Sequence, residues 1–395
     1  MSKLTTNQKM VGATVQSLGL RVTDQKLVTD TFLATDIGTA ILDNAQMKNM
    51  FFSGLVNRIG KLYLSSNQKY ENALSVFKKG TLPMGVAIED IYVNFLPNDD
   101  YSQESTLMTD TFRNDDVIAV YYTTNSYKKF YVKTSHEAFT QAFATWDDMD
   151  RFINNILSRL YDSQQLYEWS MTKQLIGNDF NQTEGTSVRK LFEYHDNTFS
   201  QDLTKMLRSS ALNMVCPSSQ NNNFQAYAKS KNDTSLSKRP VVTFSKFENL
   251  HILIRNENLT DISVDTLSVA FNLKYADFIG QVHGVDNFGI TETQTVDSKT
   301  YNKLYDYEDA SGNTHNVYDY TDYTTTESGH TYQYKLIAVI CDESYIHIED
   351  TKKAFVDSFN DPSNMILTTY LHSWQTYALC PFSNAYTIYT KTQIS

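Results

Sequence analysis

One stretch of the sequence carries an uninterrupted helical pattern that is long enough to set the layout of the whole chain. From Trp146 to Leu175 the apolar residues recur every three or four positions, the spacing of one buried face on an α-helix. Thr145 stands at the N-cap position, and Gly177-Asn178 predicts the end of the helix. About 30 residues make a rod of roughly 45 Å. Because no second stretch matches it, we expect a spine laid across a sheet rather than a helical bundle.

Length and charge narrow the class of protein. The 395 residues suffice for two or three domains with a buried core. The 34 basic and 45 acidic residues give a net charge of −11. A chain this acidic, without a basic stripe, is a poor candidate for wrapping nucleic acid, because phosphate neutralisation supplies most non-specific binding. The same charge suits a wall that must not adhere to nearby DNA.

Cysteine usage and hydropathy bear on metals and membranes. Cys216, Cys341 and Cys380 are far apart in the sequence, which indicates buried thiols in a reducing compartment. Zinc sites usually have paired ligands at short spacing, and this pattern does not occur in the sequence, so we expect no metal or other cofactor. The first twenty residues lack the apolar core of a signal peptide, and no apolar run of about 18 residues predicts a membrane span.

The first third of the chain predicts an arm and a hairpin. Residues 1 to about 40 are polar without a sustained period and indicate an extended arm, and Ala40–Ile59 has a helical pattern. Val117–Thr124 and Tyr127–Thr134 are β-rich and separated by Asn125-Ser126, which predicts a hairpin. Such a hairpin does not support itself, so we expect it to lie on another surface, such as a neighbouring subunit.

The second half of the chain alternates helix and strand patterns. Phe199–Leu212 predicts an amphipathic helix, Leu250–Ile254 a strand and Val264–Asn272 a further helix, which is typical of an α/β module. Residues 291–334 alternate tyrosines with acids around a Ser-Gly-Asn turn and indicate an exposed hairpin insertion. Leu336–Ile340 then predicts a fully buried strand.

The sequence carries few signs of catalysis. It has no phosphate-binding glycine loop, no nucleophile elbow and no Cys–His signature. Asp342 and Glu343 follow the buried strand, and His347 and Glu349 are close by, so this group is the best enzyme candidate. The alternative interpretation is a solvated strand end in a polar turn.

Eight segments of the sequence, taken in order, carry a resemblance to a known family. They are Tyr70–Gly80, Ile88–Val93, Pro240–Phe244, Ile262–Phe278, Val285–Phe288, Cys341–Glu343, His372–Trp374 and Pro381–Ala385. Together they resemble the major capsid proteins of small short-tailed Bacillus phages, podoviruses of the Picovirinae type. Two departures are visible: Ala73 stands where the family usually has proline, and the tyrosine-rich insertion has no counterpart that we can place. We also expect this sequence to lack the immunoglobulin-like domain that some relatives carry.

The resemblance implies an α+β fold, the tailed-phage major capsid protein fold named after phage Hong Kong 97. That fold has an N-terminal arm, an extended E-loop hairpin, a P-domain with a long spine helix and an α/β A-domain. The boundaries expected in this sequence are 1–60 for the arm and its leading helix, 61–87 for the P-domain lead-in, 88–134 for the E-loop, 135–195 for the P-domain with the spine at 146–176, 196–340 for the A-domain with the insertion 291–334, and 341–395 for strands that return to the P-domain.

The resemblance also implies a structural role without catalysis. Hexamers and pentamers of the chain would form an icosahedral shell around double-stranded DNA, which is non-specific cargo. Further expected partners are a scaffolding protein, a portal and head fibres, with assembly in the host cytoplasm and residence in the virion. The alternatives are a portal or tail component, or a carboxylate-dependent hydrolase using Asp342 and Glu343. The inter-subunit contacts expected from the hairpin are Arg113, Tyr121, Tyr122, Tyr127, Lys128, Phe130 and Tyr131.

Overall fold

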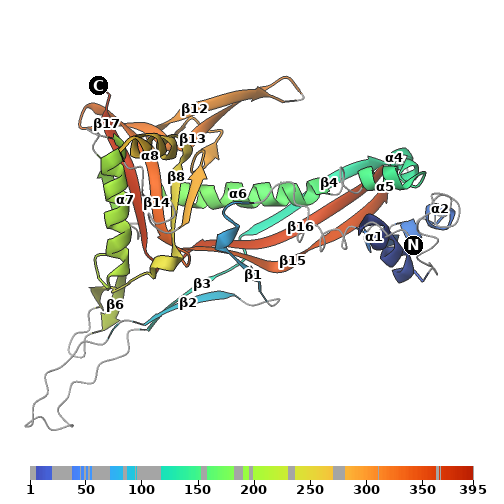
Figure 1. Cartoon of the computed structure of the whole chain (residues 1–395), viewed down its shortest axis with the longest axis horizontal. Coiled ribbons are helices and arrows are strands. Elements are labelled where there is room, and N and C mark those ends of the chain that lie inside the picture. The colour runs from blue at the N-terminus through green and yellow to red at the C-terminus, as the bar shows by residue number, and fades with distance from the viewer. Residues whose placement is uncertain are drawn as a thin grey trace, which may run out of the picture.

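The computed structural model shows an elongated molecule with a long helix along its axis and a large sheet across one end (Figure 1). None of the helices in the described part of the chain combines the length and apolar character needed to cross a membrane. The structure describes residues 6–19, 38–44, 46–48, 50–51, 54–55, 72–82, 87–93, 95, 117–152, 158–181, 190–194, 199–229, 236–269, 281–309, 311–361, 364 and 366–394.

The predicted spine is observed as α5 (Trp146–Phe152) and α6 (Ser158–Phe180), preceded by the short helix α4 (His136–Gln141). Thr145 caps the spine as expected, since its Oγ1 accepts a hydrogen bond from the backbone N–H of Asp148 at 3.2 Å. The predicted stop at Gly177 is wrong, because α6 continues to Phe180. A Cβ atom at position 177 would lie 2.1 Å from the carbonyl oxygen of Phe288. Glycine at this position therefore allows a close approach of two backbones.

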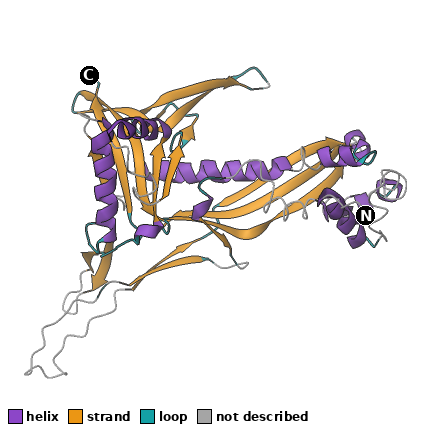
Figure 2. Ribbon diagram, viewed as in Figure 1, coloured by secondary structure: helices purple, strands orange, loops and turns teal. Residues whose placement is uncertain are grey.

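A four-stranded sheet runs beside the spine, in the order β1-β15-β16-β4, and we call it the long sheet (Figure 2). Its β1 pairs in parallel with β15, whereas β15, β16 and β4 are antiparallel. Contacts of α6 with β16 and β4 confirm the expectation of a spine across a sheet. The strands are β1 (Lys78–Thr81), β4 (Ser126–Ser135), β15 (Ile346–Asp361) and β16 (Ile366–Leu379).

A nine-stranded sheet lies at the other end of the molecule and contains the predicted α/β module. Its centre is β14, which pairs with β13, β17 and β8. The strands are β5 (Lys190–Tyr194), β8 (Leu250–Arg255), β9 (Gln281–Val285), β10 (Ile290–Thr291), β11 (Thr295–Val296), β12 (Lys299–Glu308), β13 (Thr314–Glu327), β14 (His330–Asp342) and β17 (Ala385–Gln393).

Helices cover this sheet on both faces. On one face, α7 (Phe199–Val215) and α8 (Asn256–Val269) pack on alternate residues of β8 and β14, such as Ile252 and Ile340. On the other face, the end of α6 packs against Leu253 and Val339. The predicted strand at 250–254 and helix at 199–212 are confirmed. The helix expected at 264–272 begins eight residues earlier, at Asn256, and residues 270–272 lie outside the described part.

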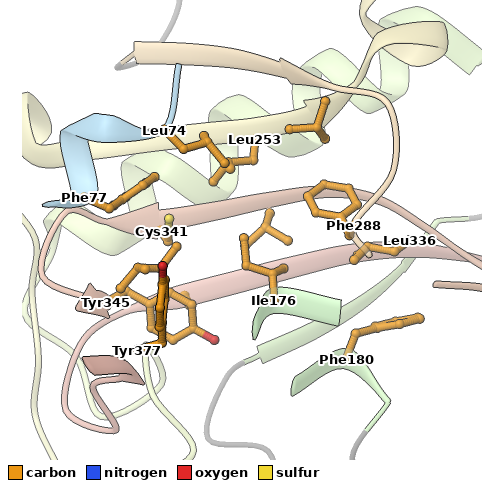
Figure 3. Packing of buried hydrophobic residues seen from close by; sticks show 14 of the residues in the cluster. Leu74, Phe77, Ile176, Phe180, Leu253, Phe288, Leu336, Cys341, Tyr345 and Tyr377 are labelled. Carbon is orange, nitrogen blue, oxygen red and sulfur yellow. The ribbon is translucent and has the colours of Figure 1, made fainter. Parts of the chain in front are cut away.

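The main core forms where the two sheets and the spine meet (Figure 3). Ile176 and Phe180 from the end of α6 contribute to it, and Phe77 arrives on the short 3-10 helix η3 (Ser75–Phe77). Tyr345 is fully buried there, and its hydroxyl donates to Asp179 at 2.7 Å. This shared core fixes the direction of the spine relative to the nine-stranded sheet.

The N-terminal region is not the extended arm that we expected. Residues Thr6–Ser17 form a helix, α1, whose Val11 and Val15 are fully buried against the far end of the long sheet. A short helix, α2 (Gly38–Leu42), follows, and the described residues 46–48, 50–51 and 54–55 are helical too, so the helical pattern predicted for 40–59 is confirmed at every described position except 43 and 44. Much of the sequence from 20 to 71 lies outside the described residues.

The hairpin predicted across Asn125-Ser126 is wrong. Strand β3 (Val117–Tyr122) pairs antiparallel with β2 (Ile88–Val93), and together they form a separate two-stranded ribbon. The strand that follows, β4, pairs with β16 in the long sheet. The physical reason is that Asn125, between β3 and β4, is bonded to β16. Its side chain donates to the carbonyl of Tyr377 at 2.7 Å and accepts from the Tyr377 N–H at 3.0 Å, so the chain enters the long sheet here instead of turning back on β3.

The tyrosine-rich insertion is a hairpin of β12 and β13 that projects from the nine-stranded sheet (Figure 1). Only its outer part is exposed, because Tyr301, Tyr318 and Tyr323 at its base are buried in the main core. A smaller antiparallel pair, β6 (Gln225–Lys229) and β7 (Leu236–Pro240), lies near the ribbon.

The terminal strands of 341–395, for which we predicted a return to the P-domain, divide between the two sheets. Strands β15 and β16 belong to the long sheet beside the spine. Strand β17 instead returns to the nine-stranded sheet, where it lies between β14 and β5. Its apolar residues Tyr386 and Ile388 complete the core under α7, which explains why the strand is drawn to that end.

Candidate inter-subunit surfaces

The ribbon of β2 and β3 has one row of side chains that faces its own chain. Ile88, Asp90 and Tyr92 are buried or half-buried, and they alternate with exposed residues along β2. The Tyr92 hydroxyl donates to the carbonyl of Val242 at 2.8 Å, and the Tyr122 hydroxyl donates to the carbonyl of Leu379 at 3.3 Å. Burial raises the pKa of both phenols. This inner row attaches the ribbon to the body of the molecule.

The outer row of the ribbon is apolar and open to solvent. Ile91, Val93 and Tyr121 are 58%, 61% and 64% exposed. The Tyr121 hydroxyl donates to Glu89 at 2.7 Å, and this hydrogen bond to the carboxylate raises the pKa of Tyr121. Phe95, just beyond β2, is also exposed. A continuous apolar row of this kind on a projecting element is typical of a protein–protein contact.

The long sheet also has an exposed side, which we call the aromatic face. Tyr127 contacts Trp374 with ring centroids 5.6 Å apart, and Tyr131 contacts Tyr370 at 6.1 Å. Lys352 lies over the Trp374 ring at 4.8 Å. Because the strands alternate, the residues between these aromatics point to the spine instead. The aromatic face consists of Tyr127, Tyr131, Phe355, Phe359, Tyr370 and Trp374.

The residues predicted from the sequence as inter-subunit contacts lie on different surfaces of the structure. Tyr121 lies on the outer row of the ribbon, whereas Tyr122 lies on its inner row. Tyr127 and Tyr131 are exposed on the aromatic face. Two others turn toward the spine, where Lys128 lies 5.5 Å and Phe130 6.0 Å from the ring of Tyr167. Arg113 lies outside the described residues.

Sequence reasoning missed the exposed apolar residues Ile91, Val93 and Phe359. The signal that could have found the first two is the alternation of Glu89, Ile91 and Val93 with the inner row of β2. Phe359 belongs to β15, whose length was not foreseen.

The outer part of the β12–β13 hairpin is a third projecting element. Leu304, Tyr305 and Tyr307 are exposed along it. Asp309 closes the turn by accepting hydrogen bonds from the N–H groups of Ser311 at 2.8 Å and Asn313 at 2.9 Å. The side-chain amide of Asn313 also donates to Asp309, at 3.0 Å, and this bond together with the backbone bonds lowers the pKa of the Asp309 carboxyl to about 2. The carboxylate is thus ionised, and able to accept these bonds, at neutral pH.

Asp342, the first carboxylate considered for catalysis, has a structural partner, whereas Glu343 is half-buried and its backbone N–H donates to the carbonyl of Asn249 at 2.8 Å. Asp342 is buried and accepts hydrogen bonds from both the N–H (2.9 Å) and the hydroxyl (2.7 Å) of Ser344. Its role is that of a turn-forming residue after β14. His347 and Glu349 lie further on, in β15, where His347 contacts Asp90 of the ribbon. Of the three cysteines, Cys341 and Cys380 are buried as expected, whereas Cys216 is exposed.

Solved structures with the same fold define the class of protein. A chain in the capsid structure of Staphylococcus phage Andhra aligns with a TM-score of 0.54 at 14% identity, covering 80% of this chain and 84% of that one. A chain in a structure of the head fibre and inner core protein gp22 of bacteriophage P68 aligns with a TM-score of 0.52 at 15% identity and the same coverage. The fold is therefore the α+β fold of phage capsid proteins, of the Hong Kong 97 type.

Sequence comparison narrows the class to a family. The model of the Phi29-like phage major capsid proteins matches residues 23–389, and this chain belongs to that family. The major capsid protein of Bacillus phage PZA is 28% identical over 263 residues, which are 66% of this chain and 55% of that protein. That of Bacillus phage B103 is 24% identical over 355 residues, 89% of this chain and 65% of that protein. The chain thus spans about half to two thirds of the length of these relatives.

Proposed function

We propose that the chain assembles with copies of itself, as hexamers and pentamers, into the icosahedral shell that encloses the double-stranded DNA of a phage. The observation that carries the proposal is the exposed apolar row of the β2–β3 ribbon. Ile91, Val93 and Tyr121 project away from the body of the chain, where each loses the stabilisation of burial, about 25 cal/mol per Å². An adjacent copy that covers this row would recover that stabilisation.

Two further surfaces support contacts between copies. The aromatic face offers exposed rings, including Tyr127 and Tyr131, beside the cation of Lys352. The outer part of the β12–β13 hairpin offers the exposed rings of Tyr305 and Tyr307 on β12. Tyrosine is enriched at protein–protein contacts because its ring is apolar and its hydroxyl is polar. Obligate interfaces of this kind commonly bury upward of about 2,000 Å².

The capsid-fold domains follow from this proposal. Residues 1–60 are the N-terminal arm and its helices, of which α1 packs on the long sheet of its own chain, strands β2 and β3 are the base of the E-loop, and 135–195 holds the spine of the P-domain. The A-domain comprises 196–340 with the insertion 291–334, and it also includes β17. The long sheet, with β4 in place of the predicted hairpin strand, belongs to the P-domain.

The remaining partners follow from the family. A scaffolding protein, a portal and head fibres would contact the shell, which is assembled in the host cytoplasm and resides in the virion. The role is structural rather than enzymatic, and the buried, hydrogen-bonded state of Asp342 supports this. The family assignment favours the shell over the portal, tail and hydrolase alternatives.

Shell assembly through the outer row of the ribbon is tested by placing two positive charges on this row. The double variant Ile91→Lys and Val93→Lys is expected to fold but to give no shells, because two lysines cannot be buried at a contact without partners. Negative-stain electron microscopy and sedimentation of the expressed protein measure shell formation. Shells at the wild-type yield would contradict the proposal.

A matched control keeps this result specific. Leu166→Lys and Leu212→Lys place the same two charges at exposed apolar residues of α6 and α7. The control is expected to form shells, and circular dichroism of both double variants checks that the chain is folded.

A further inference from the structure

Three side chains with metal-binding atoms meet where the ribbon joins the long sheet. Asp90 comes from β2, His347 from β15 and Cys380 from the residue after β16. One ligand atom of each lies within 4.8 Å of the others. His347 and Cys380 are almost fully buried, and Asp90 is half-buried on the inner row of the ribbon. Residues from three distant segments thus converge on one point.

Two of these atoms are poorly satisfied. His347 Nε2 and Asp90 Oδ2 lie 3.0 Å apart, at ion-pair distance, but their orientation does not make a hydrogen bond. Both atoms are shielded from solvent, and neither makes a well-directed hydrogen bond with a described residue, although the Tyr122 hydroxyl and the Cys380 thiol also lie close to Asp90. Leaving a buried polar atom without a partner is unfavourable, because the atom loses its hydrogen bonds to water and gains none in return. A cation bound between the two atoms would satisfy both.

The donor set indicates which cation. One carboxylate, one imidazole and one thiolate are ligands that Zn²⁺ accepts, whereas Mg²⁺ and Ca²⁺ prefer oxygen ligands alone. Three protein ligands leave the fourth position of a tetrahedral site for water. Burial raises the pKa of the Cys380 thiol to about 11. The free site therefore holds a thiol, and the proton would pass to solvent when the sulfur binds the metal.

The surroundings of His347 suit this role. Its Nδ1 lies 4.0 Å from Glu349 Oε1, and a carboxylate that receives the second ring N–H commonly orients a metal-binding histidine. Lys79 Nζ lies 3.0 Å from the same Nδ1 in the metal-free arrangement. Because Lys79 is exposed, it can release this contact to solvent when Nε2 binds the metal and Nδ1 carries the proton.

We propose that Asp90, His347 and Cys380 bind one Zn²⁺ ion per chain and that this ion fastens the β2–β3 ribbon to the long sheet. The inner row already attaches the ribbon through the two hydrogen bonds between the Tyr92 hydroxyl and the Val242 backbone and through the stacking of Tyr92 on Phe382, and a metal–ligand bond at Asp90 would add a further attachment, to the long sheet. The site itself does not depend on shell assembly. Only its effect on the ribbon as an inter-subunit contact rests on the proposed function.

Titration with Co²⁺, followed by Zn²⁺, tests the site on the full-length chain. The wild type is expected to take up one equivalent of Co²⁺ with a thiolate-to-cobalt charge-transfer band, and Zn²⁺ is expected to abolish the band. Cys380→Ser and His347→Gln are expected to lose it. Cys216→Ser is the matched control, since this cysteine is exposed and outside the cluster, and it is expected to keep the band. A wild-type spectrum identical to that of Cys380→Ser would overturn the proposal.

Thermal unfolding provides a second measurement in case a core variant does not fold. A ligand that binds only the folded state raises the unfolding midpoint, so Zn²⁺ is expected to stabilise the wild type and Cys216→Ser. Asp90→Asn, on the half-buried ribbon strand, is expected to show a smaller shift. An equal shift in all variants would mean that zinc binds elsewhere, and the proposal would fail. Shells that form normally from a chain without zinc affinity would reject the site but leave the proposed function intact.

Discussion

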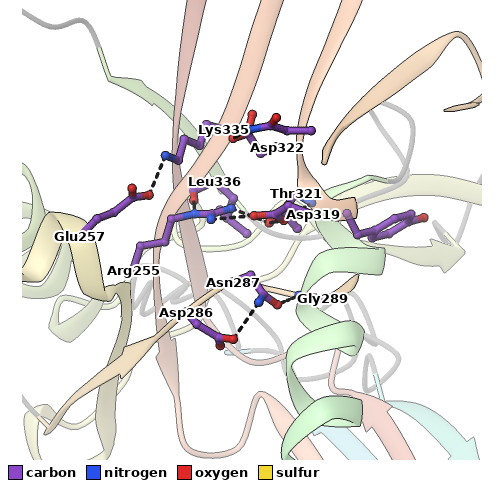
Figure 4. Close-up of polar contacts among 12 residues, drawn as sticks. Arg255, Glu257, Asp286, Asn287, Gly289, Asp319, Thr321, Asp322, Lys335 and Leu336 are labelled. Carbon is purple, nitrogen blue, oxygen red and sulfur yellow. Dashed lines mark hydrogen bonds and ion pairs between the residues drawn. The ribbon is translucent and has the colours of Figure 1, made fainter. Parts of the chain in front are cut away.

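Arg255 of β8 and Asp319 of β13 form a buried ion pair, with Nη1 2.7 Å from Oδ2 and side chains only 4% and 2% exposed (Figure 4). The same guanidinium donates to the hydroxyl of Thr321 at 2.8 Å and to the carbonyl of Leu336. Arg255 thus connects the α/β half of the nine-stranded sheet to the base of the tyrosine-rich hairpin.

We predict that Arg255→Met lowers the free energy of unfolding by about 3–5 kcal/mol, because the carboxylate of Asp319 is left buried without its cation. Urea denaturation followed by circular dichroism measures the loss. The double variant Arg255→Met and Asp319→Asn is expected to recover part of it, since no charge is then stranded. A double variant no more stable than the single one would contradict this explanation.

Gly177 is predicted to tolerate no side chain. In Gly177→Ala the new methyl group would lie 2.1 Å from the carbonyl oxygen of Phe288, so one of the two backbones must move. We expect a loss of about 1–3 kcal/mol although alanine is the better helix former. Ser163→Ala, at an exposed position of the same helix, is the control and is expected to change stability by less than about 0.5 kcal/mol. Equal stability of both variants would show that the contact with Phe288 relaxes freely.

The spine could be predicted because the 3.6-residue period of its apolar side chains is a local feature of the sequence. The buried polar residues that the spine contacts could not be predicted in this way. Glu168 is almost fully buried, and its carboxylate accepts hydrogen bonds from Lys78 at 2.8 Å and from Gln375 at 2.6 Å. Those partners lie 90 and 207 positions away, so nothing in the helical pattern identifies them.

The ribbon illustrates a different limit. Strands β3 and β4 are separated by three residues, and local turn chemistry predicts that they pair with each other. Their actual partners, β2 and β16, are chosen by contacts such as that of Asn125 with Tyr377, which a local pattern does not contain. The exposed rows on these strands follow from the pairing, and for that reason only part of the candidate contact surface could be predicted from the sequence.

Acid is predicted to weaken the fold at the pair His251 and His283, whose ring nitrogens Nδ1 and Nε2 lie 3.2 Å apart on neighbouring strands. Burial lowers the pKa of both imidazoles in the folded state. In the unfolded chain both would take up protons near pH 6.5, so the unfolded state binds more protons and stability falls as the pH drops below that value. Between about pH 7.5 and about pH 5.5, which lie on either side of the pKa of a solvated imidazole, the unfolding midpoint of the wild type is expected to fall. The midpoint of His283→Gln is expected to fall less than that of the wild type.

His330→Gln provides the control for this experiment, because His330 is exposed at the turn between β13 and β14. Its midpoint is expected to follow the wild type over the same pH range. A pH profile of His283→Gln that coincides with the wild type would assign the acid sensitivity to other groups.

The last prediction concerns the DNA that the proposed shell encloses. With a net charge of −11, the chain is expected to bind double-stranded DNA weakly, because few phosphates can be neutralised and few counterions released. Filter-binding titrations at low and moderate salt measure both the affinity and its salt dependence. We expect little binding even at low salt and a shallow slope of affinity against salt concentration, which is compatible with a wall that confines DNA without holding it. Tight binding that falls steeply with salt would instead reveal a basic surface that contacts many phosphates, and the inner wall would then have to be an active DNA-binding surface.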